Sequence, residues 1–365
     1  MALIPSHISS PCLMLPSGSD QENNSNTRCF LSLADKKTYK INNVFHDLLD
    51  AWCVGSSQGW LVVLDNKANP YLFSPFSKDK IQLPSFPTEL KPKVSDSYFV
   101  QHLLKLFILK AVLLFDNQNK HIVVVIYGNS SRLAFCMHGD NNTTWTGFGT
   151  PRSGPYCDII CYNNQLYALK DNGLVEAWNF GGSTLFPTKI MSFRPVIDVS
   201  NNKELFPPHK FSTQSYLVES MGQLLLVNRF IGNFVNSKGV VVDESYLLDT
   251  EDTQPLVCPY RTKVFHVYKL DFGRNRWEKV ESLGDRVIFL GGNQSVSLSI
   301  RDVQGFESNT IYYTDDNWYQ MNEDYLYGGH DCGVFNLKDG SSKTLYQCDF
   351  EKIDPPPFWI IPTRC

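Results

Sequence analysis

The chain has 365 residues, of which 42% are hydrophobic and 13% aromatic, so it can bury the core of one large domain or of two ordinary ones. Charged residues make up 19% of the chain, and this low fraction argues against long disordered tracts. The net charge of −4 offers no basic surface for nucleic acid or for an anionic membrane.

The ten cysteines are scattered and never form a Cys-x-x-Cys pair, so no structural zinc site is expected. In a chain of this length they are predicted to be reduced, buried, small hydrophobic residues. The N-terminus lacks the basic start and uninterrupted apolar stretch of a signal peptide, and no run approaches a membrane-spanning length. We therefore expect an intracellular protein, cytoplasmic or nuclear.

Residues 1–27 are mostly polar and are predicted to form a flexible N-terminal segment. The folded domain is predicted to span residues 28–365. Its first strand patterns lie at residues 29–33 and 38–41, where apolar and β-branched residues come between turn-forming clusters.

Residues 53–84 are typical of an antiparallel meander, because short apolar runs alternate with clusters of Gly, Asn, Asp and Pro. Gly55 and Gly59 are expected to flank a polar turn. Trp60 then begins an apolar run rich in aromatic and β-branched residues, which are the residues that strands favour.

The block at residues 98–115 is apolar, but its leucines and lysines would also suit a helix, so its structure stays open. Residues 121–127 are predicted to form a central strand with neighbours on its C-terminal side. Asn-Asn and Asn-Gly dipeptides farther along are typical of tight hairpins, since both residues tolerate positive φ. Units of similar rhythm recur at residues 157–180, 215–280, 286–300 and 310–346, and a last strand pattern lies at 358–362.

These units repeat about every forty to sixty residues with degenerate sequence, as expected for propeller blades of four strands. We therefore predict an all-β protein, a single β-propeller of six or seven degenerate, kelch-like, four-stranded blades. A loop insertion at residues 232–262 and a second long segment at 195–213 are expected on one face. Two β-sandwiches side by side are the alternative architecture.

Catalytic patterns are weak. Adjacent carboxylates on a strand point to opposite faces, so solvated acidic loops are the preferred interpretation of three pairs. His330–Asp331 resembles the orienting pair of a catalytic histidine, but no nucleophile elbow accompanies it, and a turn after two glycines explains it equally well. The three acidic pairs are Asp243–Glu244, Glu251–Asp252 and Asp315–Asp316.

The histidines lack metal-binding spacing, and no phosphate-binding loop is present. Tryptophans in strand patterns are expected to fill the core rather than to stack on a ligand. The sequence therefore predicts no catalytic, cofactor-binding or metal-binding residue, no cofactor, and partner-binding residues that are unknown. The tryptophans that lie in strand patterns are four of the seven in the chain: Trp60, Trp178, Trp277 and Trp359.

A set of ordered motifs is spread along the chain: Cys53-x-Gly55-Ser56-Ser57-x-Gly59-Trp60-Leu61, Leu72–Phe76, Ile81-x-Leu83-Pro84, Trp277–Gly291, Asn309–Asp316 and Gly333–Gly340. Together they resemble the plant KIB-type β-propeller family, first catalogued as a domain of unknown function in F-box proteins. The resemblance covers residues 12–362 and departs from the family at Ser74, where an Asn usually precedes Pro-Phe. It implies that the propeller recruits a target protein, while in family members an F-box binds a Skp1-like adaptor of a cullin ubiquitin ligase.

The resemblance implies a non-enzymatic protein–protein recognition propeller, similar to the part of F-box proteins that recruits the target protein in SCF ubiquitin ligases. Residues 1–28 show no F-box pattern, so direct binding of a Skp1-like adaptor is not expected. The target protein is unknown, and neither nucleic acid nor a membrane is expected as a partner. The alternative is a glycosidase-like propeller hydrolase with channel carboxylates. Two or three carboxylates within about 10 Å in a channel pocket would favour the hydrolase, and an apolar channel would favour recognition.

Overall fold

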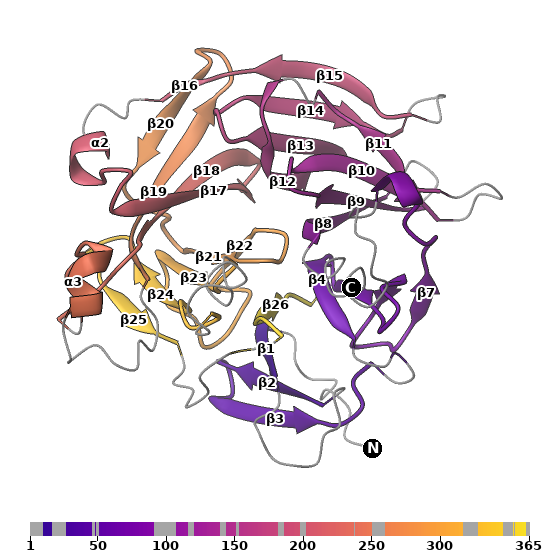
Figure 1. Ribbon diagram of the computed structural model, residues 1–365, viewed down its shortest axis with the longest axis horizontal. Coiled ribbons are helices and arrows are strands. Elements are labelled where there is room, and N and C mark those ends of the chain that lie inside the picture. The colour runs from indigo at the N-terminus through magenta and orange to yellow at the C-terminus, as the bar shows by residue number, and fades with distance from the viewer. Residues whose placement is uncertain are drawn as a thin grey trace.

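In the computed structural model, six β-sheets are arranged around a central axis as the blades of a propeller (Figure 1). The prediction of an all-β propeller is confirmed, with six blades rather than seven. The ring excludes the alternative of two β-sandwiches. The structure describes residues 10–16, 27–45, 48, 51–90, 107–115, 120–138, 144–150, 153–181, 186–197, 202–236, 238–249, 260–316, 328–345, 353 and 355–362.

Blades 1, 2 and 3 have four strands each, numbered here around the ring from the blade that holds the N-terminal strand. From the inside outward, blade 1 is β26 (Phe358–Ile360), β1 (Cys12–Pro16), β2 (Arg28–Ser32) and β3 (Lys37–Ile41); blade 2 is β4 (Trp52–Ser57), β5 (Trp60–Leu64), β6 (Pro70–Phe73) and β7 (Lys80–Gln82); blade 3 is β8 (Ile108–Phe115), β9 (His121–Tyr127), β10 (Arg132–Met137) and β11 (Thr146–Phe148).

Blade 4 has four strands, whereas blades 5 and 6 have five. From the inside outward, blade 4 is β12 (Tyr156–Tyr162), β13 (Gln165–Lys170), β14 (Val175–Asn179) and β15 (Thr188–Phe193); blade 5 is β17 (Phe211–Ser220), β18 (Gln223–Gly232), β19 (Arg261–Asp271), β20 (Arg276–Val280) and β16 (Val196–Ile197); blade 6 is β22 (Val296–Ser299), β21 (Arg286–Leu290), β23 (Thr310–Tyr313), β24 (Gly333–Asn336) and β25 (Ser342–Thr344).

Blade 1 joins the two ends of the described chain and so closes the ring. The C-terminal strand β26 pairs antiparallel with β1, with Cys12 opposite Ile360 and Met14 opposite Phe358. The prediction that residues 1–27 form a flexible segment is therefore wrong for Cys12–Pro16, which are a strand of the propeller. The apolar run that forms β1 is short, and it finds its innermost partner only at the opposite end of the chain. Residues 1–9 and 17–26 lie outside the described residues.

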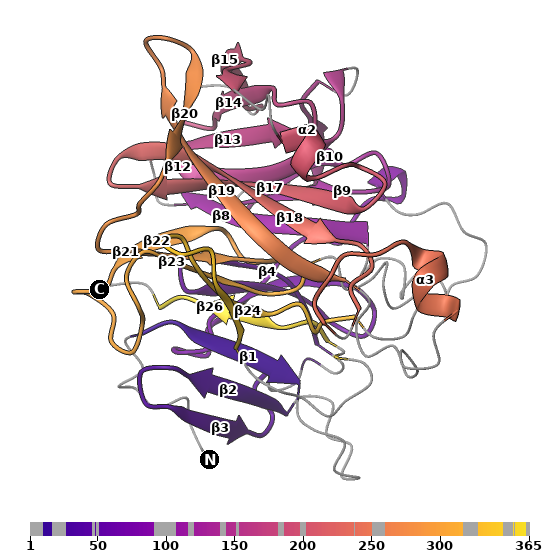
Figure 2. The ribbon, with the colours of Figure 1, turned by 90° about the vertical axis from the view of Figure 1, so that its left-hand side faces the viewer.

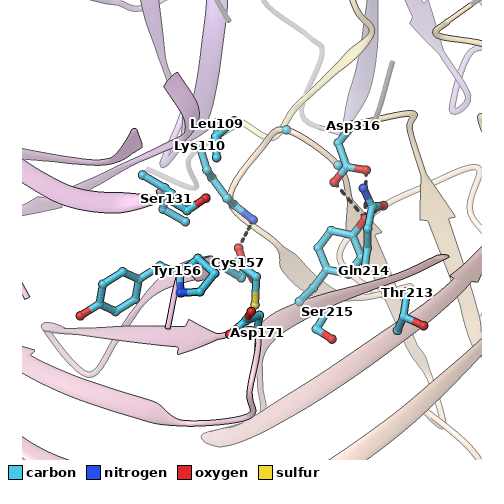
Figure 3. A pocket seen from close by; sticks show the side chains of 16 residues that line it. Leu109, Lys110, Ser131, Tyr156, Cys157, Asp171, Thr213, Gln214, Ser215 and Asp316 are labelled. Carbon is cyan, nitrogen blue, oxygen red and sulfur yellow. Dashed lines mark hydrogen bonds and ion pairs between the residues drawn. The ribbon is translucent and has the colours of Figure 1, made fainter. Parts of the chain in front are cut away.

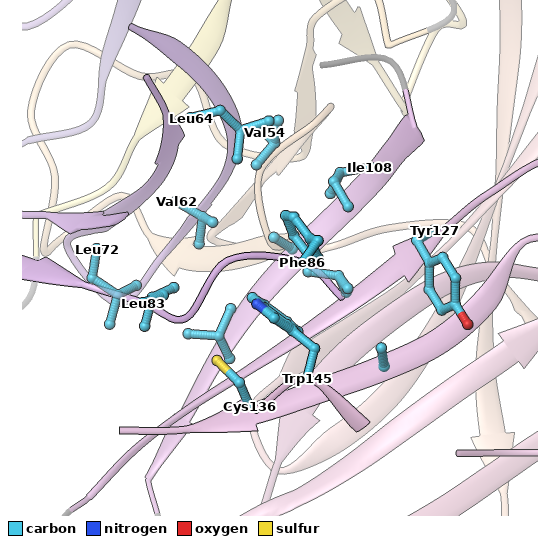
Figure 4. Packing of buried hydrophobic residues seen from close by; sticks show 14 of the residues in the cluster. Val54, Val62, Leu64, Leu72, Leu83, Phe86, Ile108, Tyr127, Cys136 and Trp145 are labelled. Atoms are coloured by element: carbon cyan, nitrogen blue, oxygen red, sulfur yellow. The ribbon is translucent and has the colours of Figure 1, made fainter. Parts of the chain in front are cut away.

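The hydrophobic core is divided into six layers, each between two neighbouring blades. Strands within a blade, such as β9 and β21, are therefore covered on both faces, which explains why their sequences are almost continuously apolar. Outer strands such as β15 are mostly exposed. Figure 4 shows the layer between blades 2 and 3, where the rings of Phe86 and Trp145 stack with centroids 4.6 Å apart.

The predicted tryptophans behave as core residues. Trp178, Trp277 and Trp359 are buried, and the half-buried Trp60 packs against the layer between blades 2 and 3. All seven described cysteines are free thiols, as predicted. Four of them are buried, but Cys29 and Cys161 are half-buried and Cys157 is exposed, so the prediction of burial is wrong for Cys157.

Gly55 is needed because blades 2 and 3 approach closely. It lies within β4, and a Cβ atom at this position would be 2.4 Å from the carbonyl oxygen of Ala111 on β8. The turn after β4 lies at Gln58–Gly59, whereas the sequence predicted it between Gly55 and Gly59. Gln58 and Gly59 make the turn with φ of 50° and 76°, and the preceding serines complete β4.

Two expectations about chain order need correction. The units at residues 286–300 and 310–346 are not separate blades, because β21 pairs in parallel with β23 and both belong to blade 6. In the block at 98–115, Ile108–Phe115 is strand β8, whereas residues 98–106 lie outside the described residues.

Long connections gather at one edge of blade 5. β18 ends at Gly232, which lies opposite both Phe211, where β17 begins, and Arg261, where β19 begins. The segment between β18 and β19 carries helix α3 (Glu244–Asp249), and the segment before β17 carries α2 (Asn202–Leu205). Figure 2 shows α3 at the face where β18 ends. The third helix described is a single 3-10 turn, η1 (Thr88–Leu90), and no helix in the described ranges is long and apolar enough to cross a membrane.

Replacing Trp359 with Ala tests the ring closure. Trp359 is fully buried in β26 and packs edge-on against Phe289 of blade 6, with ring centroids 5.1 Å apart. Truncating such a ring is expected to lower the free energy of unfolding by about 3–5 kcal/mol in urea titrations. Val196→Ala, at a residue with 72% of its surface exposed, is the control and should cost less than about 0.5 kcal/mol. Equal unfolding midpoints for the two variants would contradict the ring-closing role.

Candidate functional site

A polar pocket of about 440 Å³ lies where the innermost strands of blades 3, 4 and 5 begin (Figure 3). Its rim includes exposed residues, among them Leu109 with 54% of its surface accessible, whereas Lys110, Asp158 and Tyr216 deeper in the pocket are buried. The pocket is therefore lined by exposed and buried side chains together. It opens at the edge of blade 5 where the long connections gather, because β17 contributes residues from its first half.

The connection between β21 and β22 contributes to the lining of the pocket. Gly291 and Gly292 line it, and a Cβ atom on Gly292 would lie 2.6 Å from the ring of Phe358. The chain then reaches blade 2, where the N–H of Gln294 donates to the carbonyl of Ser56 at 2.7 Å. The Ser57 hydroxyl donates to the side-chain oxygen of Gln294 at 2.6 Å. The β21–β22 hairpin extends toward the middle of the ring in Figure 1.

Lys110 and Asp158 form an ion pair inside the pocket. Both side chains are almost completely buried, and the N–H of Leu217 also donates to the Asp158 carboxylate, at 2.6 Å. Burial raises the pKa of Asp158, while the Lys110 ammonium and the Leu217 N–H oppose part of that rise. The pair joins β8 of blade 3 to β12 of blade 4 and, through Leu217, to blade 5, so it fixes three walls of the pocket.

A second buried charge, Arg229 on β18, lies behind the wall that Tyr216 and Asp316 form. Only 1% of its side chain is exposed. The guanidinium has five N–H donors in one plane, and its partners surround it on several sides. We call this group the Arg229 cluster: Arg229 donates to Thr262 Oγ1 (2.7 Å), to the carbonyls of Thr314 (2.8 Å) and Asp331 (3.0 Å), and to the carboxylates of Asp331 (2.9 Å) and Asp316 (3.2 Å).

Tyr216 connects the Arg229 cluster to the pocket. Its hydroxyl donates to Asp316 at 2.9 Å and accepts from Arg229 at 3.3 Å. Burial and the neighbouring Asp316 carboxylate raise the pKa of Tyr216, so the hydroxyl stays protonated and remains a donor. Asp316 is thus oriented by two fixed groups.

The same region ties two long connections together at their ends. The hydroxyl of Tyr260, just before β19, donates to Asp315, and the N–H of Gly329 donates to the same carboxylate at 2.8 Å. Burial raises the pKa of Asp315 to about 6, and the nearby Asp331 carboxylate adds to the rise. The segment that follows β18 and the segment that follows β23 are therefore joined where they enter the blades.

The structure changes the interpretation of the acidic patterns. Asp243 and Glu244 are exposed, as expected, and Glu251–Asp252 lies outside the described residues. The prediction of a solvated loop is wrong for Asp315, which is buried, because its hydrogen-bond donors come from distant parts of the chain. Asp331 does not orient His330; it is buried against Arg229 and Thr262.

Sequence reasoning did not identify the residues that shape the pocket. The available signal was an isolated charge within an apolar strand, since lysine, arginine and aspartate are almost never fully buried unless they are paired. Three residues carry that signal: Lys110, Asp158 and Arg229. Within the described ranges, no three His, Cys, Asp or Glu side chains are grouped to hold a metal ion.

The fold and the pocket define a six-bladed propeller with a polar pocket on the face that carries its long connections. The model of the KIB1-4 beta-propeller family matches residues 30–336. The chain belongs to this family, as the sequence motifs suggested.

The relatives that match most of the chain are named as F-box proteins. A putative F-box protein of Arabidopsis thaliana is 24% identical over 339 residues, which cover 90% of this chain and 76% of that protein. The F-box/kelch-repeat protein KIB1 of Arabidopsis thaliana is 25% identical over 307 residues, covering 82% of this chain and 64% of KIB1. Among solved structures, the N-terminal domain of Nup159 aligns over 94% of this chain and 87% of its own, with 11% identity and a TM-score of 0.38, a likeness that supports no conclusion about function.

Replacing Arg229 with Met tests the Arg229 cluster. The change leaves the Asp331 carboxylate buried without its cation, so the free energy of unfolding is expected to fall by about 3–5 kcal/mol. Combining it with Asp331→Asn removes the uncompensated charge and should recover part of the loss. Urea unfolding of both variants measures the effect. A double variant no more stable than Arg229→Met would contradict the assigned pairing.

Asp315 gives a pH-dependent prediction. Its pKa is about 6 in the folded state, against about 3.9 in an unfolded chain. Between these values the folded state holds a proton that the unfolded state has lost, so this group makes the free energy of unfolding fall as the pH rises from about 4 to about 6. Asp315→Asn should remove that slope, which amounts to on the order of 2 kcal/mol across the window. Denaturant titrations at several pH values measure it, with the exposed Asp243→Asn as control. If the free energy of unfolding depended on pH in the same way for wild type and Asp315→Asn, the result would contradict a raised pKa for Asp315.

Proposed function

We propose that this chain is a non-enzymatic recognition propeller whose pocket-bearing face binds a target protein. The observation that carries the proposal is the joining of the long connections to the walls of one polar pocket through the Arg229 cluster. Loops held by a rigid scaffold are where binding residues concentrate. Membership of a family whose relatives are named as F-box proteins supports a role in protein interaction.

We further propose that the bound protein is a ubiquitination target. The names of the relatives support this step, because an F-box protein brings a target to a ubiquitin ligase. How this chain would contact the ligase is a separate prediction: direct binding of a Skp1-like adaptor is not expected from residues 1–28, and co-purification with such an adaptor tests it. A stable stoichiometric complex would contradict that prediction.

A propeller hydrolase is the second candidate, and one observation favours it. Three carboxylates line the pocket, so the channel is not apolar: Asp158, Asp171 and Asp316. Glycosidases need two carboxyl groups that are free to act on the substrate. Here Lys110 and the Leu217 N–H engage Asp158, while Tyr216 and Arg229 engage Asp316. These internal partners support recognition over hydrolysis. If the protein hydrolysed chromogenic glycosides and Asp158→Asn abolished this activity, the result would favour the hydrolase over the recognition function.

Proximity labelling in plant cells with a matched pair of variants tests the recognition proposal. Leu109→Arg adds a long charged side chain to the pocket rim, and Ile190→Arg adds the same side chain to the outer strand β15, where 44% of the residue is exposed. Proteins labelled by wild type and by Ile190→Arg, but not by Leu109→Arg, are the expected result. Identical labelling by all three forms would contradict binding at the pocket face.

A further inference from the structure

The pocket combines exposed and buried lining residues. Leu109, Pro155 and Asp171 are exposed, whereas Lys110, Asp158 and Tyr216 are buried. The chain at Gly291–Gly292 lines the pocket and then reaches blade 2. A volume of about 440 Å³ is near the lower end of the range for ligand sites, about 300–1,000 Å³, and suits a single inserted group better than a folded element.

Negative charge dominates the pocket and the layer behind its walls. Among the lining residues and the Arg229 cluster, Lys110 and Arg229 are the cations, and each is already bound to a carboxylate. The same set holds four carboxylates, so negative charge is in excess: Asp158, Asp171, Asp316 and Asp331. Lys170, the buried cation that precedes Asp171, lies outside this set and interacts electrostatically with Asp171. In a recess with low-dielectric walls such an excess attracts a cation more strongly than it would on an open surface.

Asp171 is the carboxylate that the fold leaves available. It is exposed at the pocket rim, and its carboxylate makes no hydrogen bond or ion pair with any residue in the described part of the chain. Its position is nevertheless fixed. Its N–H donates to the carbonyl of Pro155 at 3.1 Å, and Gly154 packs so closely that a Cβ atom there would lie 2.9 Å from Asp171 Oδ1.

A buried amine holds the segment that positions Asp171. Lys170 is 1% exposed, and its ammonium donates to the carbonyl of Thr150 and to the hydroxyl of Ser153, both at 2.6 Å. Its ammonium also lies 4.2 Å from the centroid of the Tyr156 ring. The available carboxylate is therefore held in place before any ligand arrives, which reduces the entropy lost on binding.

The pocket also offers exposed apolar surface, from Leu109 and Pro155. A group that suits both parts has an aliphatic stem and a cationic head, as arginine and lysine side chains do. We propose that the pocket receives one basic side chain, an arginine or a lysine, of the target protein; this rests on the recognition function proposed above. The stem would lie along Leu109 and Pro155, and the cation would pair with Asp171.

The test uses short Gly/Ser peptides with one central Arg, Lys, citrulline or Glu, titrated into the full chain and followed by ligand-observed NMR. Citrulline matches arginine in shape and lacks its charge. We expect the Arg and Lys peptides to bind about tenfold more tightly than the citrulline peptide. Asp171→Asn should weaken the Arg peptide by about three- to tenfold and leave the citrulline peptide unchanged. Glu281→Gln, at a carboxylate with 79% of its side chain exposed outside the pocket, is the matched control and should change neither.

Several outcomes overturn the proposal: no saturable binding of the Arg and Lys peptides, equal affinity for the citrulline peptide, a preference for Glu, or full affinity in Asp171→Asn. If free agmatine bound more tightly than the Arg peptide, the result would contradict the proposal that the cation belongs to a side chain of a target protein. The recognition function is judged separately by Leu109→Arg in cells. If Leu109→Arg loses a labelled target in cells but the Arg and Lys peptides do not bind, the recognition function is supported and the proposal of a bound basic side chain is contradicted.

Discussion

The pocket face depends on the buried guanidinium of Arg229. It donates to the Thr262 hydroxyl of blade 5 and to the carbonyls and carboxylates of the connection between β23 and β24, and it does so where water cannot replace it. A buried charge of this kind gives little net stability, because desolvation offsets much of the attraction. Its main contribution is to fix the positions of its partners, because each acceptor can bond to the planar N–H donors of Arg229 in only one geometry. Tyr216 and Asp316 transmit that position to the pocket wall.

The rest of the ring supplies rigidity around this cluster. Six apolar layers between blades hold the inner strands, β26 closes the circle, and the connection through Gly291 and Gly292 reaches across to blade 2. The long segments then enter the blades at fixed points, through Asp315 with Tyr260 and Asp331 with Thr262. The base of each long connection is therefore held in one position, and this position does not depend on what the rest of the connection contacts.

Much of the fold could be predicted from the sequence, because local patterns determine it. Asn163 and Asn164 both have positive φ, as an Asn-Asn hairpin turn requires, and apolar runs of five to seven residues became strands. β1 was missed because its innermost partner is β26, at the other end of the chain, and no local pattern indicates that pairing. The pocket was missed for a related reason. The sequence displays Lys110, Asp158 and Arg229 as charges inside apolar strands, but their partners lie on other blades, so only the folded ring reveals that they are paired.

The central claim is that a target binds at the face where the pocket opens. Hydrogen–deuterium exchange of the chain with and without a captured target, measured by mass spectrometry, tests it most directly. The account predicts new protection at the start of β8, in the turn at Asp171–Gly173 and in the first half of β17, with no change in the outer strand β15. Protection confined to β15 and other outer strands, with the pocket strands unchanged, would contradict it.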